Sequence, residues 1–125
     1  MHRNRLLVVL AAWAVPGLGH LLLGRRAKAA WFGLLILGTF GLGLVLGEGS
    51  SVSSARYPWH MCGQIGAGLA ALLADGLLGS RPQAATIDRL ELGLVYTAVA
   101  GILNLVAMVD AYELARGETA EERAS

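Results

Sequence analysis

Few side chains in this 125-residue chain have types and spacing that could do chemistry. His20 and Asp110 are a histidine and a carboxylate, each in or beside apolar sequence, that could share a proton. The three histidines, His2, His20 and His60, lack a paired spacing such as His-x-x-x-His, so no metal site is predicted. Cys62 is the single cysteine, which excludes an internal disulfide and a Cys-x-x-Cys redox motif.

Catalytic motifs are otherwise missing from the sequence. The serines at 50–54 belong to no Gly-x-Ser-x-Gly element and have no neighbouring base. The run Gly63-x-x-Gly66-x-Gly68 has glycines like a nucleotide-binding loop, but it lies in apolar sequence and follows no predicted strand. No basic stripe with interleaved aromatic residues predicts nucleic-acid binding. We therefore expect a protein that is not an enzyme and uses no cofactor, metal or nucleic acid.

Four apolar stretches make up most of the chain. They run over residues 6–24, 29–47, 61–79 and 92–109, and each is therefore 18 or 19 residues long. A membrane-spanning helix needs about 20 apolar residues. Hydrophobic residues make up 55% of the sequence and charged residues 15%, with 17 glycines, which agrees with a membrane protein. The sequence predicts an all-α integral membrane helical bundle, with one transmembrane domain at 1–112 and a polar, frayed C-terminal tail at 113–125.

The first stretch contains a break. Pro16 removes a backbone donor and pushes Val15 toward extended geometry, and Gly17 and Gly19 loosen the chain further. Broken backbone at membrane depth must be covered by protein or face water. We expect three full spans plus an N-terminal re-entrant or kinked helical segment, and four complete spans remain the alternative.

The distribution of basic residues favours the re-entrant arrangement. If all four stretches cross, Lys and Arg divide five to five between the two faces, which shows no orientation bias. If the first stretch returns to its starting side, seven of the ten share the cytoplasmic face, namely Arg3, Arg5, Arg25, Arg26, Lys28, Arg81 and Arg89. The loop at 48–60 is then exported, the loop at 80–91 is cytoplasmic, and the chain is a multi-pass protein of the bacterial inner membrane. Arg25, Arg26 and Lys28 are expected to meet anionic lipid headgroups.

Small and polar residues within the apolar stretches predict contacts between helices. Small residues recur at i+4 spacing, which lets helix backbones approach closely. Such rows indicate internal packing or a surface for another membrane protein, and they comprise Gly63, Ala67 and Ala71, then Gly66, Ala70 and Ala74, then Gly93, Thr97 and Gly101. Polar side chains in lipid are costly and mark structural or proton-handling positions, here His20, Gln64, Asn104 and Asp110, with Asp75 nearer a helix end.

Two resemblances follow from these motifs. Residues 16–25, including Pro16, Gly17, Gly19, His20, Gly24 and Arg25, resemble the PGxGHxYxGR motif of small bacterial membrane proteins related to the TM-two-domain proteins. In that group an Asp closes the last helix, a place that Asp110 occupies, whereas Leu22 replaces the usual aromatic residue. The chain also resembles an uncharacterised bacterial membrane family through Gly63-Gln64 and through Tyr96-Thr97-Ala98-Val99-Ala100-Gly101 with Asn104, Asp110 and Ala111. The second resemblance implies an architecture but no activity.

These features predict a non-catalytic accessory or scaffolding subunit of a larger bacterial membrane complex. Its partners would be membrane lipids and other membrane protein subunits, and self-association into a homo-oligomer stays open. The alternative is a small transporter, channel or ion-coupled module that uses His20 and Asp110. An enzyme acting on lipid would have only that same pair available.

Overall fold

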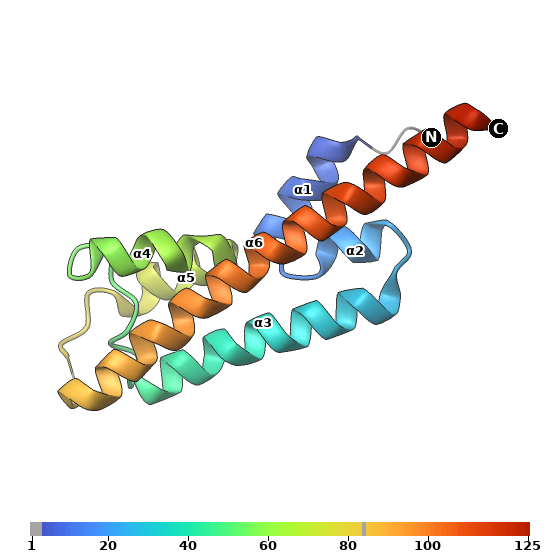
Figure 1. Cartoon of the computed structure of the whole chain (residues 1–125). Coiled ribbons are helices and arrows are strands. Elements are labelled where there is room, and N and C mark those ends of the chain that lie inside the picture. Colours follow the sequence, from blue (N-terminus) through green and yellow to red (C-terminus); the bar gives the residue numbers. More distant parts are fainter. Residues whose placement is uncertain (1–3, 84) are drawn as a thin grey trace.

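The computed structural model describes residues 4–83 and 85–125, and these residues form helices and loops without a strand. Figure 1 shows two long helices with shorter helices packed around them. In chain order the elements are α1 (Arg5–Ala14), α2 (Leu18–Leu22), α3 (Arg26–Leu46), α4 (Pro58–Gln64), the 3-10 turn η1 (Ile65–Ala67), α5 (Leu69–Leu78) and α6 (Ile87–Ala124). The all-α prediction is therefore confirmed for the described residues.

Two of these helices, α3 and α6, are long and apolar enough to cross a membrane. The 21 residues of α3 extend about 32 Å at 1.5 Å per residue, close to the hydrocarbon thickness. The two helices run antiparallel and pack along much of α3 (Figure 1). The prediction of three or four such helices is wrong, because within the described residues the other two apolar stretches are each divided into short helices.

The first apolar stretch breaks where its proline predicts. Helix α1 ends at Ala14, and Val15 is extended at φ −132° and ψ 118°, as expected for a residue before proline. Gly17 then takes a left-handed φ of 89°, and α2 begins. A Cβ at Gly17 would overlap the carbonyl oxygen of Ala29, so both the backbone turn and the close approach of α3 require glycine here.

The third apolar stretch is also broken, and this break was not predicted. Helix α4 ends at Gln64, the chain tightens into η1, and α5 starts after Gly68. Gly68 has φ 71° and ψ −132°, a conformation that side chains rarely adopt, and a Cβ there would overlap the carbonyl oxygen of Trp13. The predicted full span at 61–79 is therefore a second pair of short helices.

The two broken segments lie at opposite ends of α6. Helix α1 packs on the C-terminal half of α6, where Val8 and Ala12 join Ala111 and Ala115 in one apolar cluster. Helix α4 packs on the N-terminal half, where Gly63 faces Ala98. The start of α1, the end of α6 and the turn between α2 and α3 are at one end of the molecule, and the loops before α4 and before α6 are at the other (Figure 1).

These positions correct the prediction for the two loops. The loops expected on opposite faces lie together, because the Arg56 side chain donates to the Arg81 carbonyl at 3.1 Å and the Tyr57 hydroxyl donates to Gln83 at 3.1 Å. The segment at 48–60 is partly buried, since Ser51, Val52 and Ser53 are inside the fold, and residues 58–60 form the first turn of α4.

The C-terminal segment at 113–125 is helical rather than frayed. Helix α6 continues through it to Ala124, although its outer residues are polar. Ala111 and Ala115 are buried against α1, which extends the packed face of α6 beyond its apolar stretch. At 38 residues, α6 is about 57 Å long, so it exceeds the thickness of a bilayer core.

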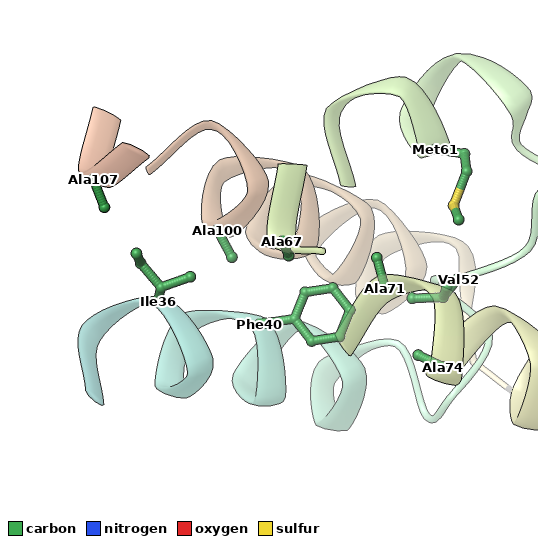
Figure 2. Close-up of a cluster of buried hydrophobic side chains, with 9 residues drawn as sticks. All are labelled: Ile36, Phe40, Val52, Met61, Ala67, Ala71, Ala74, Ala100 and Ala107. Atoms are coloured by element: carbon green, nitrogen blue, oxygen red, sulfur yellow. The ribbon is translucent and has the colours of Figure 1, made fainter. Parts of the chain in front are cut away.

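The main core is built largely from alanine. Figure 2 shows Ile36 and Phe40 of α3 facing the small side chains of η1, α5 and α6, with Val52 and Met61 at one end. The small residues allow the backbones to approach closely, so that packing of backbone against backbone replaces a thick layer of side chains. This close approach positions the polar side chains described below.

Candidate functional site

Asn104 of α6 joins the two broken segments. Its Nδ2 donates hydrogen bonds to the carbonyl oxygen of Gly66 at 2.7 Å and to that of Trp13 at 3.3 Å. The indole Nε1 of Trp13 donates to the carbonyl oxygen of Ile65 at 3.0 Å. Interrupted helices leave carbonyl groups without helical partners, which is costly away from water. Asn104 thus supplies donors to both interruptions from one fully buried side chain.

Neighbouring backbone lies directly against the small residues around Asn104. A Cβ at Gly66 would overlap the carbonyl oxygen of Gly101, and a Cβ at Gly101 would overlap that of Gly63. Ala67 is buried in the core and Ala70 packs against it. The rows predicted on the third and fourth stretches therefore form internal seams, although the break at Gly68 prevents them from following one continuous helix face.

A second buried amide, that of Gln64, connects α4 and the loop before it to the N-terminal half of α6. Gln64 Nε2 donates to the carbonyl oxygen of Ser51 at 2.8 Å and to Thr97 Oγ1 at 2.6 Å. Thr97 Oγ1 lies 2.9 Å from the carbonyl oxygen of Gly93, to which it donates. These bonds tie α4 and the preceding loop to α6, and the approach of α3 at Gly43 to Gly93 closes the same region.

Asp75 fixes the loop before α4. Its two carboxylate oxygens accept hydrogen bonds from the backbone N–H and the hydroxyl of Ser54, both at 2.8 Å. The hydroxyl of Ser53 donates to the carbonyl oxygen of Gly79 at 3.0 Å. The structural role of these serines was not predicted, and their clustering in a short loop was the only signal for it in the sequence.

The structure brings His20 of α2, Lys28 at the start of α3 and Asp110 of α6 together. His20 is fully buried, its Nε2 lies 2.7 Å from Asp110 Oδ2, and its ring stacks on Phe32 with centroids 4.8 Å apart. Lys28 Nζ lies 3.0 Å and 3.3 Å from the two oxygens of Asp110. With the carboxylate as acceptor, His20 donates from Nε2, while Nδ1 has no hydrogen-bond partner among the described residues. The pair can hold or transfer a proton in this geometry.

The glycine motif explains why His20 faces α6. A Cβ at Gly19 would overlap Ala12, so α2 can lie directly on α1. Gly24 has φ 74°, and the N–H of Arg25 donates to the carbonyl oxygen of His20 at 2.9 Å, which completes the turn into α3. That turn places Lys28 in the first turns of α3, beside Asp110. The participation of Lys28 and Phe32 was not predicted.

The remaining chemical candidates are not part of this site. His60 and Cys62 lie on α4, and His2 lies outside the described residues, as does Arg3. Among residues 4–83 and 85–125, no three His, Cys, Asp or Glu side chains are grouped so that they could hold a metal ion.

Comparison with known proteins identifies one family. The family DUF6677, described as a family of unknown function, matches residues 7–122 and thus covers the helices from α1 to α6 apart from the first residues of α1 and the last residues of α6. No curated protein sequence and no solved structure matches the chain. With nearly its whole length matched, the chain belongs to the DUF6677 family.

Proposed function

We propose that this protein is a non-catalytic scaffolding subunit of a larger membrane protein complex, and that the outer face of α3 binds another membrane helix. One observation carries the proposal. The face of α3 turned away from α6 forms a shallow apolar groove of about 300 Å³. Its lining residues are Trp31, Leu34, Leu35, Gly38, Thr39 and Leu42.

The glycines of α3 support this use of the groove. A Cβ at Gly43 would overlap Thr97 of α6, whereas a Cβ at Gly38 or Gly41 would meet no atom within 4 Å. A glycine inside a helix costs about 1 kcal/mol relative to alanine. Close approach of a second helix would offset that cost at Gly38 and Gly41, as the approach of α6 does at Gly43. Thr39 leaves no polar hydrogen exposed in the groove, because its hydroxyl donates to the Leu35 carbonyl at 2.7 Å.

The proposed setting is the bacterial inner membrane, with α3 and α6 crossing it and the two broken segments entering from opposite sides. Six basic residues of the described chain belong to the start of α1, the start of α3 and the last turns of α6, Arg5, Arg25, Arg26, Lys28, Arg116 and Arg123. Three belong to the opposite end, in the loops before α4 and α6 and the first turn of α6, Arg56, Arg81 and Arg89. The positive-inside rule therefore supports a cytoplasmic location for the start of α1 and the end of α6. The PGxGHxYxGR resemblance supports a bacterial source and a distant likeness to TM-two-domain proteins.

Purification of the tagged chain in mild detergent, followed by native mass spectrometry, tests the proposal. We expect a stoichiometric complex with another membrane protein. Gly38→Leu should remove that partner while leaving the chain folded, because the added side chain projects into open space. Gly76→Leu is a matched control, since Gly76 also has open space around it but lies on α5, outside the groove. A wild-type chain that carries no membrane protein, or a partner equally retained by Gly38→Leu, would contradict the proposal.

A second candidate function is a small ion-coupled module. The observation that favours it is the contact of 2.7 Å between the buried His20 and Asp110, whose carboxylate is also paired with Lys28. Proton or ion flux into liposomes that contain the purified chain tests this function. Loss of flux in His20→Ala with intact folding would support it, and normal flux in both His20→Ala and Asp110→Asn would exclude a role for the pair.

A further inference from the structure

We infer that the groove between α2 and α3 binds an anionic phospholipid, with one acyl chain in the groove and the phosphate beside Arg25 and Arg26. This site lies on another part of α3 from the proposed partner-binding groove. It depends on the chain lying in a membrane but not on the presence of a protein partner.

The shape and polarity of the groove fit an acyl chain. It has a volume of about 330 Å³ and opens toward the surroundings of the molecule. Apart from Arg26, its walls are almost entirely apolar, with Pro16, Leu18 and Leu21 on the α2 side and Ala29 and Ala30 on the α3 side. The break at Pro16 creates this groove, because a continuous helix would not have placed α2 against the start of α3.

The charge at one end of the groove fits an anionic headgroup. Arg26 lines the groove, and Arg25 precedes it at the turn into α3. Both side chains are exposed, and neither forms an ion pair with any described residue. Lys28 differs, because Asp110 neutralises it. Two neighbouring guanidinium groups are therefore available to a phosphate, which arginine binds through paired N–H donors.

The sequence around α3 increases the local positive potential. The first turn of α3 contains no acidic residue, and no side chain caps its N-terminus. The positive end of the helix dipole therefore adds to the charges of Arg25 and Arg26 instead of opposing them. An anion beside these residues would reduce the electrostatic repulsion between the two guanidinium groups and the positive end of the helix. A zwitterionic lipid, with its own cationic group, would reduce this repulsion less.

Native mass spectrometry of the purified full-length chain, with phosphatidylglycerol or phosphatidylcholine of identical acyl chains added, tests the inference. We expect retained adducts of phosphatidylglycerol and few of phosphatidylcholine. Substitution of both Arg25→Gln and Arg26→Gln should weaken phosphatidylglycerol binding by about tenfold. The matched control is Arg116→Gln with Arg123→Gln, which removes the same charge from the same end of the molecule and should leave binding unchanged.

A second variant tests the acyl-chain part of the site. Ala30→Trp would fill the groove without changing any charge, and we expect it to abolish retention of phosphatidylglycerol although both arginines remain. Equal retention of the two lipids by the wild-type chain would overturn the inference, as would equal loss in the two arginine double variants. Displacement of the lipid by glycerol 1-phosphate alone would also overturn it, because the site would then recognise a free phosphate. None of these outcomes requires a protein partner, so failure here is separate from failure of the proposed scaffolding function.

Discussion

The side-chain amide of Asn104 lies 2.7 Å from the backbone carbonyl of Gly66 and points its hydrogen at that oxygen. The same nitrogen reaches the carbonyl of Trp13 at 3.3 Å. Two interruptions of apolar helices, far apart in the sequence, are therefore held by one residue of α6. This contact explains how a chain with two interrupted segments keeps its backbone polar groups paired inside an apolar fold.

Replacement of Asn104 tests that explanation. Asn104→Leu removes both donors and leaves the carbonyl oxygens of Gly66 and Trp13 without them. We expect a loss of about 1–3 kcal/mol in the free energy of unfolding, measured by denaturation in detergent. Thr119→Ala provides a control, because the Thr119 hydroxyl bonds only within the polar end of α6. Equal stability of Asn104→Leu and the wild-type chain would show that the contact does not support the fold.

Bulky residues at the internal seams should act on folding rather than on partner binding. Leucine at Gly66 or Gly101 would force apart backbone segments that are in direct contact. We expect destabilisation of about 1–3 kcal/mol or failure to fold, detected as a shift in the unfolding midpoint. Gly76→Leu should leave that midpoint nearly unchanged, because its side chain meets open space. A stable Gly101→Leu variant that had lost only a partner would instead place this seam on an outer surface.

The contact between His20 and Asp110 can be measured by a double-mutant cycle. His20→Ala, Asp110→Asn and the double variant should give a coupling energy of about 1 kcal/mol. The expected value is modest because the Asp110 side chain is 35% exposed and retains Lys28 as a second partner. Strictly additive effects of the two substitutions on unfolding would show that the residues do not interact in solution.

The sequence predicted the first interruption more successfully than the second. Pro16 acts through its own ring and its missing donor, so its effect on Val15 and on the following turn is local. Gly68 is ambiguous, because glycine in an apolar stretch serves either close packing or a positive φ. In the folded chain Gly68 serves both uses, because its φ is 71° and the carbonyl of Trp13, far away in the sequence, lies where a Cβ would be. The number of long helices was therefore overestimated.

The candidate site shows the same difference between local and distant signals. The glycines that surround His20 were recognisable as a motif, and Asp110 was considered as a partner of His20. Lys28 was assigned to lipid headgroups, since nothing in the sequence brings it to a carboxylate on α6. Residues 113–125 were expected to fray because of their polarity, but α6 continues through them to Ala124, and Ala115 is packed against α1.

The side of the membrane on which α6 ends distinguishes the proposed two-crossing arrangement from the re-entrant arrangement expected from sequence. In the proposed arrangement α3 and α6 are the two crossings, so α6 ends on the side where α3 begins, and the basic residues at that end favour the cytoplasm. A C-terminal green fluorescent protein fusion should therefore fluoresce, and a C-terminal alkaline phosphatase fusion should be inactive. Three full crossings after a re-entrant segment would give the reverse pair of results.

Site-specific photo-crosslinking in native membranes tests the scaffolding proposal most directly. A photoreactive amino acid at Leu42 lies in the groove on α3, whereas one at Leu77 lies on the exposed face of α5. The proposal predicts one discrete membrane-protein adduct from Leu42 and no such adduct from Leu77. Absence of a protein adduct from Leu42, or the same adducts from both positions, would contradict a partner-binding face on α3.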